Sequence, residues 1–124
     1  MNKVVSDYKK HKFICGKYDC CMFAADIVKA KTGKDLAEKY RGTYTTELGA
    51  AKALKKYGTM TETLDANFDR LDDINFAKRG DIVTFVGGHG VGVVWSGGIL
   101  GMNVEHGLVK TDDEVKTIWR IISD

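Results

Sequence analysis

The sequence lacks several features that would place it in particular classes of protein. No run approaches the roughly eighteen consecutive apolar residues that a membrane-spanning helix needs. The N-terminus has no apolar stretch followed by a small-residue cleavage site. The 19 basic and 17 acidic side chains of the whole sequence form no long block of one sign, so neither nucleic acid binding nor membrane insertion is expected. We therefore expect a soluble cytoplasmic protein without a signal peptide.

Cysteine is scarce and unevenly placed. The three cysteines, Cys15, Cys20 and Cys21, all fall in one short segment. An odd number clustered in this way does not form a framework of bridges, so reduced thiols are expected. The three histidines, at positions 11, 89 and 106, do not supply the second close pair of ligands that a structural zinc site needs. We therefore expect no metal and no other cofactor.

What is present is an ordinary globular composition. With 124 residues, 44% apolar and 29% charged, the chain fits a single domain over residues 1–124. Neither a repeat nor a linker divides it. The part before Gly58 is rich in helix formers with apolar residues three and four apart, whereas β-branched residues and glycines follow Arg79. Helices followed by a sheet predict the α+β class.

A capped helix is predicted from Cys20 to about Lys31. Asp19 stands just before it, where a carboxylate can accept hydrogen bonds from free backbone N–H groups. Gly33 stands where a left-handed residue commonly ends a helix. The apolar residues fall on one helical stripe and predict a central, mostly buried helix: Phe23, Ile27 and Ala30, flanked by Ala24 and Val28.

A second clear helix is predicted from Thr45 or Thr46 through Lys56, with Gly58 ending it. Its apolar residues in register are Leu48, Ala51, Leu54 and Tyr57. Between the two helices, residues 35–38 have a carboxylate at the first position and a glutamate three residues later, which is capping-box spacing, and predict a short turn that ends near residue 40.

The second half of the chain predicts a sheet. Residues 60–77 are polar, and we expect a loop with one helical turn there. Alternating glycine-rich turns and β-branched runs then predict an antiparallel meander with strands at residues 81–86, 91–95, 99–104, 108–109 and 115–122.

A cysteine in the first turn of a helix differs from an ordinary buried thiol. The unsatisfied N–H groups and the helix dipole favour negative charge there, which biases Cys20 toward the thiolate. The adjacent Asp19 carboxylate opposes this bias, and a histidine brought close by the fold would decide in favour of an ion pair. The alternative is that Cys20 and Cys21 are small core-facing residues, as free cysteines usually are.

Five short motifs occur in order along the chain. They are FICGKYDCCMF at residues 13–23, RGTY at 41–44, RGDIV at 79–83, HGVGVV at 89–94 and the pair Trp119-Arg120. Together they resemble the papain-like cysteine amidases and endopeptidases of the NlpC type, most closely a small branch carried by tailed phages. The resemblance covers nearly the whole length. It implies a papain-like fold, with N-terminal helices packed on a C-terminal antiparallel sheet or half-barrel.

The resemblance also implies a catalytic set. Cys20 would be the thiol nucleophile, and its own N–H would contribute to an oxyanion site near the helix start. A general base would stand at the start of the second strand, with a third polar residue to orient it. Amide hydrolysis needs each of these: a nucleophile at neutral pH, a proton carrier for the leaving amine, and donors that face the tetrahedral oxyanion.

The base is where the sequence departs from the family pattern. The family histidine directly precedes Val-Gly-Ile, whereas Gly90 occupies that place here and His89 lies one residue earlier. Successive strand residues point to opposite faces, so His89 is either re-aimed by a bulge or turn to act as base, or is an exposed turn histidine. His106 is the other candidate base, with Asn103 and Glu105 as third-residue candidates; the alternative is an exposed turn between strands.

Three further residues are candidates for substrate or oxyanion contacts. Asp19 adjoins the nucleophile, and Tyr18 would replace the tyrosine that the family often places near the oxyanion, where this chain has Phe13. Tyr18 is equally a packed or surface residue. Arg41 matches the phage branch and would clamp a carboxylate of the substrate or, alternatively, one of the protein itself.

Two functions of different classes follow from the resemblance. The first is a phage thiol amidase or endopeptidase, tail-associated and directed at cell-wall peptide bonds. The second is a structural or assembly protein of a phage tail with a decayed catalytic set, and a thiol acyl transferase or intracellular effector is a weaker third. The expected partners are tail or other virion proteins and a peptide or peptidoglycan substrate. The expected location is the host cytoplasm during assembly, then the virion.

Overall fold

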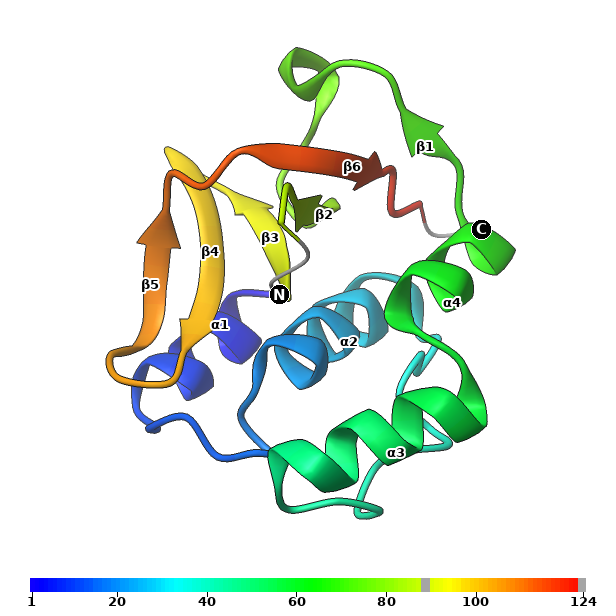
Figure 1. Cartoon of the computed structure of the whole chain (residues 1–124). Helices are drawn as coiled ribbons and strands as arrows, with labels where there is room; N and C mark the ends of the chain where they lie inside the picture. Colours follow the sequence, from blue (N-terminus) through cyan, green and yellow to red (C-terminus); the bar gives the residue numbers. More distant parts are fainter. Residues whose placement is uncertain (88–89, 123–124) are drawn as a thin grey trace.

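A layer of helices lies against one face of an antiparallel sheet in this computed structural model (Figure 1). The structure describes residues 1–87 and 90–122, without the side chains of Leu54 and Tyr57. In chain order the elements of this part are α1 (Asn2–Lys9), α2 (Cys20–Thr32), α3 (Glu47–Tyr57), α4 (Met60–Asn67), β1 (Arg70–Leu71), the 3-10 turn Ile74–Phe76, β2 (Ile82–Phe85), β3 (Val91–Trp95), β4 (Gly98–Asn103), β5 (Gly107–Thr111) and β6 (Val115–Trp119). The predicted α+β class is confirmed.

The sheet runs in the order β1-β6-β2-β3-β4-β5, with all pairs antiparallel. The predicted meander is confirmed for β2 through β5. It is wrong for the last strand, which crosses back to lie between β1 and β2. Ile118 and Trp119 are both buried, in separate apolar clusters on the two sides of the sheet. A strand that buries both faces takes an interior position, and the edge beside β5 does not provide one.

Helix α2 is central, as predicted. Asp19 is its N-cap, and Gly33 ends it with φ of 82°. Phe23, Ile27 and Val93 of the facing strand β3 are all completely buried, and each such side chain contributes roughly 1.5–3 kcal/mol relative to exposure. Ala30, expected on the same stripe, is exposed, because the helix leaves the core before its last turn.

The helices after α2 differ from their predictions. The expected apolar register of α3 is wrong at its first two positions: Leu48 is 69% exposed and Ala51 is exposed, while Ala53 is buried. The other two expected positions, Leu54 and Tyr57, have side chains outside the described part of the structure. The start of α3 lies close to the preceding loop, since a β-carbon on Gly49 would be 3.0 Å from that of Tyr44. Residues 60–77 form the two-turn helix α4, strand β1 and a 3-10 turn rather than a loop with one helical turn.

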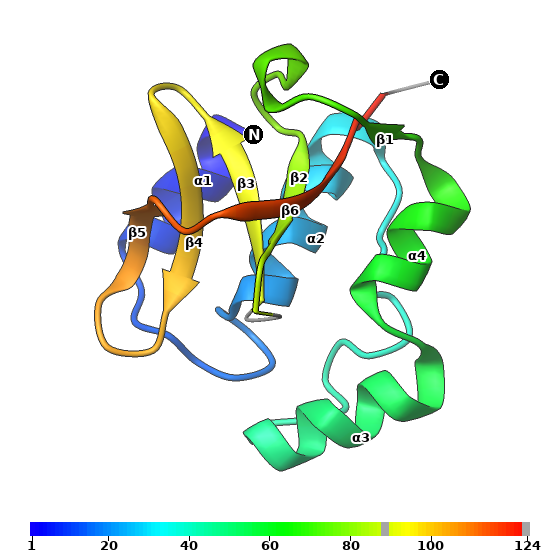
Figure 2. The same cartoon turned by 45° about the horizontal axis from the view of Figure 1, so that its top comes forward.

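Helix α1 is an element that the sequence pattern did not indicate. It buries Val5 and Tyr8 against α2 and the sheet, while its other faces carry charged residues. Figures 1 and 2 show α1 and α2 on one face of the sheet, with α3 and α4 on the side of α2 away from β4 and β5. The first turn of α2 lies at one end of this layer of helices. In the part of the chain that the structure describes, the helices are too short or too polar to cross a membrane.

Candidate active site at the start of α2

The loop before α2 is fixed by Asp19. This carboxylate is 5% exposed. Its Oδ1 accepts a hydrogen bond from the Met22 N–H at 2.8 Å, and its Oδ2 accepts from the Gly16 N–H at 2.8 Å and from the Tyr44 hydroxyl at 2.8 Å. Gly16 has φ of 86°, and any β-carbon there would collide with the Tyr44 carbonyl oxygen. Asp19, an expected substrate or oxyanion contact, is therefore engaged with the protein itself.

The Cys20 sulfur faces the beginning of β3. A β-carbon built on Gly90 would lie 3.1 Å from the Cys20 Sγ. The backbone N–H of Val91 donates a hydrogen bond to the same sulfur. Cys20 as a whole residue is half-buried. The position to which the resemblance would assign a histidine, directly before Val91, thus lies beside Cys20, and a glycine occupies it.

The pKa of Cys20 is lowered from its ordinary value to about 7. The main cause is a hydrogen bond from the Cys21 thiol, and burial works against it; the N–H groups of Val91 and Cys21 add to the lowering, while the Asp19 charge opposes it. The pKa of Cys21 is raised well above its ordinary value, because its proton is held by the Cys20 sulfur and because it is buried. At neutral pH the Cys20 thiol is therefore partly ionised, while Cys21 keeps its proton and donates it to the Cys20 sulfur.

A pocket of about 230 Å³ adjoins this thiol pair. It is bounded by α2, the start of α4, and strands β2, β3 and β6, through residues Cys21, Thr59, Met60, Thr61, Thr84, Phe85, Gly90, Val91 and Lys116. Gly90 both lines the pocket and meets the Cys20 sulfur. A larger pocket of about 440 Å³ lies beyond the far end of α2, but neither a thiol nor an imidazole lines it. The smaller pocket is the one with reactive chemistry beside it.

The histidine candidates are placed differently from one another. His89 lies outside the described residues, directly before Gly90. His106 has a side chain that is 71% exposed and pairs with Glu105 at 3.8 Å. Asn103 Oδ1 accepts hydrogen bonds from the N–H groups of Glu105 and His106, at 2.8 and 3.1 Å. Asn103 is the last residue of β4, and Glu105 and His106 lie in the exposed turn that follows it, which was the alternative interpretation. Among the described residues, none of the three forms a hydrogen bond or ion pair with Cys20.

Tyr18 points away from the thiol pair. Its hydroxyl donates to Asp7 at 3.1 Å, and its ring stacks on His11 at a centroid distance of 4.1 Å. The tyrosine that supports the site is Tyr44, which sequence reasoning missed as a site residue. Its signal was the RGTY motif, of which it is the last member. Its hydrogen bond to Asp19 ties the chain before α3 to the loop that presents Cys20.

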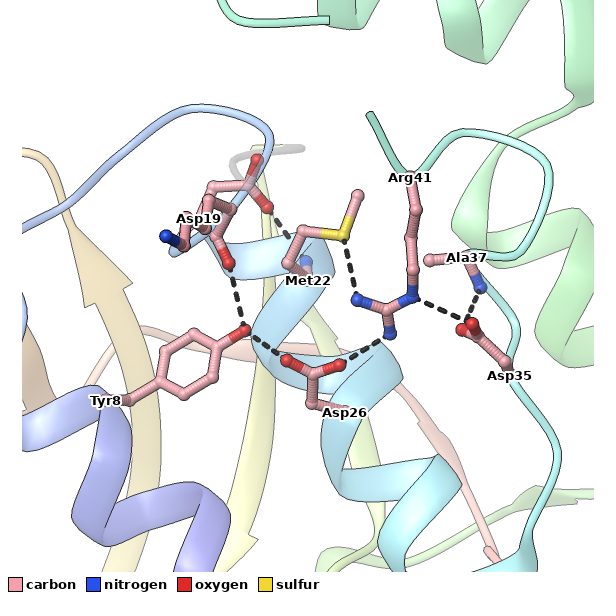
Figure 3. Close-up of polar contacts among 8 residues, drawn as sticks. Tyr8, Asp19, Met22, Asp26, Asp35, Ala37 and Arg41 are labelled. Carbon is pink, nitrogen blue, oxygen red and sulfur yellow. Dashed lines mark hydrogen bonds and ion pairs between the residues drawn. The ribbon is translucent and has the colours of Figure 1, made fainter. Parts of the chain in front are cut away.

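Arg41 holds the protein's own carboxylates (Figure 3). Its Nη2 pairs with Asp26 of α2 and its Nε donates to Asp35 at 2.8 Å. Tyr8 donates to the other oxygen of Asp26 at 2.6 Å. Burial raises the pKa of Asp35, but the hydrogen bond and charge of Arg41 outweigh it and leave that pKa below its ordinary value. The internal ion pair, one of the two interpretations of Arg41, is the one found.

The Asp35 turn departs from capping-box geometry. Asp35 Oδ1 accepts from the Ala37 N–H, two residues on, at 3.0 Å, and the following residues form turns rather than a helix. Among the described residues, no three His, Cys, Asp or Glu side chains gather closely enough to hold a metal ion.

Comparison with known proteins gives a family and nothing closer. No curated protein and no solved structure matches the chain. One family model matches residues 1–121, which is nearly the whole chain. The protein therefore belongs to the family described as a domain of unknown function, DUF6950.

Proposed function

We propose that this protein is a papain-like thiol amidase or endopeptidase in which Cys20 is the nucleophile. The observation that carries the proposal is the state of Cys20: it is half-buried at the first position of α2, its pKa is about 7, and its neighbours Cys21 and Gly90 line a pocket. A thiolate present at neutral pH attacks an amide carbonyl carbon to form a thioester, and the C–N bond breaks as the amine leaves with a proton. Water then hydrolyses the thioester and restores Cys20.

The backbone around the thiol supplies donors for the oxyanion. The N–H groups of Cys20 and Cys21 lie in the first turn of α2, where they have no partner within the helix. The Val91 N–H approaches the sulfur from the sheet side. A carbonyl carbon bonded to the Cys20 Sγ would place its oxygen among these donors, as acyl transfer requires.

We assign the base to His89. Gly90 has φ of 76°, and a β-carbon built on it would lie 3.1 Å from the Cys20 Sγ. His89 lies outside the described residues, and its place in the sequence directly before Gly90 supports the assignment. The absence of a side chain at position 90 leaves the approach to the Cys20 Sγ open. A histidine one position earlier than in the family pattern is consistent with a turn at Gly90 that re-aims it.

The motifs of the phage branch have structural roles that support a papain-like scaffold. Asp81 of the RGDIV motif is completely buried and accepts from the Ile121 N–H at 3.0 Å and from Arg120 at 3.3 Å. Trp119 is completely buried and donates to Asp65 at 2.8 Å. Trp119 thus ties the last strand to α4, and Arg120 ties the chain after that strand to Asp81, directly before β2. We propose a tail-associated phage protein, made in the host cytoplasm, that acts on cell-wall peptides.

Thiol labelling and hydrolysis together test this function. Iodoacetamide at pH 7 should label Cys20 faster than Cys15 and Cys21, and His89→Ala should slow that labelling. Purified cross-linked cell-wall peptides should gain free amino ends with the full chain, and Cys20→Ala should abolish the gain. Cys15→Ala, which removes a thiol from the same segment, is the matched control. Equal labelling of all three cysteines, with no amine release, would contradict the proposal.

A second function is favoured by one specific observation. Position 90 is a glycine, and the described histidines, His11 and His106, have partners other than Cys20. A structural or assembly protein of a phage tail that keeps the scaffold but has lost its catalytic base would have these two features. In the same experiment it would show rapid Cys20 labelling that His89→Ala and His106→Ala leave unchanged, with no hydrolysis of cell-wall peptides.

A further inference from the structure

A pocket of about 460 Å³ opens on the face of the sheet opposite to α1 and α2 (Figure 2). We call it the outer pocket; residues 71–74 line one side of it, and residues 114–116 and 118 line the other. Leu71 pairs with Ile118 across the ladder between β1 and β6, which fixes the two sides relative to each other. Ile118 belongs to the apolar cluster of this face, whereas Cys20 packs against the cluster on the helix side of the sheet.

The apolar part of the outer pocket is left uncovered by the helices of the described chain. Leu71, Val115 and Ile118 pack in the cluster of this face. Ile74 adds a side chain that is 43% exposed, and Phe76 in the same 3-10 turn is 68% exposed. Single exposed apolar residues are common, but two large ones in one turn at the edge of an apolar pocket are typical of a surface that binds another protein.

The charged residues that line the outer pocket are mostly acidic. Asp72, Asp73 and Glu114 contribute carboxylates. Lys116, which also borders the pocket beside Cys21, contributes one ammonium. Three carboxylates against one ammonium leave an excess of negative charge, whereas the whole chain carries a net charge of +2. The outer pocket is therefore complementary to a cation, in contrast to the chain as a whole.

The carboxylates of the outer pocket are not held by cations of the protein. Asp65, close by in α4, pairs with Arg70 at 2.8 Å. In the part of the chain that the structure describes, the three carboxylates of the outer pocket form no such ion pair. Asp73 accepts a hydrogen bond from the Asn75 N–H at 2.9 Å and so caps the 3-10 turn. A partner that brings a cation would therefore gain charge pairs here without displacing an internal one.

We propose that the outer pocket is a docking site for a segment of another protein in which an arginine stands between apolar residues. The aliphatic stem of that arginine packs on the apolar side of the pocket, and its guanidinium pairs with the carboxylates. Arg41 shows the same arrangement within this chain, where Asp26 and Asp35 hold one guanidinium. The apolar neighbours of the arginine cover Ile74 and Phe76. This docking site does not depend on the proposed function, because Cys20 takes no part in it.

Binding of a synthetic peptide to the full chain tests the docking site. The probe is acetyl-Leu-Arg-Leu-amide, and its matched control has citrulline, which keeps the length of arginine without its charge. The arginine peptide should shift the amide resonances of Leu71, Val115 and Ile118 in a saturable way and leave that of Val91, beside Cys20, unchanged. The citrulline peptide should bind about three-fold more weakly, the size expected for one exposed charge pair. Added salt should reduce this difference.

Two double variants separate the outer pocket from the general charge of the chain. Asp72→Asn with Glu114→Gln should weaken the arginine peptide about ten-fold, and both side chains are exposed, so the fold should remain. Asp112→Asn with Asp113→Asn removes the same charge from the turn before β6, outside the pocket, and should leave the affinity near that of wild type.

Three outcomes would overturn the proposal. The first is the absence of a saturable shift, or shifts of equal affinity with the arginine and citrulline peptides. The second is equal weakening by the two double variants. The third comes from sedimentation without peptide: a dimer that Glu114→Gln dissociates would assign the outer pocket to a second copy of this chain rather than to a different protein. A monomer that binds the arginine peptide with the expected losses would support it.

Discussion

The middle of α2 and its first turn hold negative charge in different ways. In the middle, Asp26 is paired with Arg41 and accepts from Tyr8, so a full cation and a hydroxyl fix it. At the first turn, the Cys20 thiolate is supported by a neighbouring thiol and by backbone N–H groups. Strong partners hold a structural charge in place, whereas weak neutral donors lower a pKa and still leave the sulfur free to react. The difference distinguishes a charge that stabilises the fold, at Asp26, from the thiolate that is proposed to react, at Cys20.

The largest expected effect comes from removing the cation of the scaffold region. Arg41→Met leaves Asp26 and Asp35 without their partner in sites that are only 27% and 19% exposed. The free energy of unfolding should fall by about 2 kcal/mol, less than for a completely buried pair because water screens part of the charge. Urea unfolding measures this change. Labelling of Cys20 should keep its wild-type rate in the folded protein; a slower rate would show that the two regions are coupled.

A smaller effect is expected where the sheet meets the thiol. Gly90→Ala adds a β-carbon 3.1 Å from the Cys20 Sγ, at a residue with φ of 76°. The left-handed backbone should cost about 1–2 kcal/mol of unfolding free energy, and iodoacetamide labelling of Cys20 should slow. Gly97→Ala, also at positive φ but in the β3–β4 turn, is the matched control for backbone strain. If both variants slow labelling equally, the contact with the sulfur is not the cause.

The smallest change in stability, with a clear change in reactivity, is expected for the thiol donor. Cys21→Ala removes the main group that lowers the pKa of Cys20 from its ordinary value to about 7. A lowered pKa means that thiolate persists to lower pH, so losing the donor moves the labelling midpoint upward, by about one pH unit. Rates of iodoacetamide labelling between pH 5 and 10 measure the midpoint.

Two controls sharpen this pH experiment. Cys21→Ser keeps a hydroxyl donor beside Cys20 and should restore much of the lowered midpoint. Cys15→Ala removes a thiol outside α2 and should leave the midpoint near 7. A midpoint that stays near 7 in Cys21→Ala would show that the Val91 and Cys21 backbone N–H groups suffice.

Local signals in the sequence predicted the part of the fold that depends on local chemistry. Asp19 and Gly33 bracket α2 because a cap and a left-handed glycine act within a few residues, and the structure confirms both. The α+β class followed from the change along the chain from helix-forming residues to β-branched residues and glycines. The RGTY motif pointed to Arg41, and the sequence left open whether its guanidinium binds a carboxylate of the substrate or one of the protein itself. No local pattern predicts that Asp26 and Asp35 are its partners.

Features that depend on distant contacts were not predicted. The predicted register of α3 failed at Leu48, which is exposed although it is apolar, whereas Ala53 is buried. Helical spacing alone does not show which face of the helix meets the core. The return of β6 to β2 depends on the burial of Ile118 on one face of the strand and of Trp119 on the other. The hydrogen bond between Cys21 and Cys20 depends on side-chain geometry at adjacent positions, and the extra residue Lys116 in β6 belongs to a bulge that only strand pairing reveals.

Strand β6 carries one residue more than its partner β2, which has a consequence for how the strand tolerates deletion. Thr84 pairs with Thr117 and the next residue of β2, Phe85, pairs with Val115, so Lys116 has no pairing partner across this ladder. A chain without residue 116 would therefore keep both of these pairs, and neither layer would need to repack.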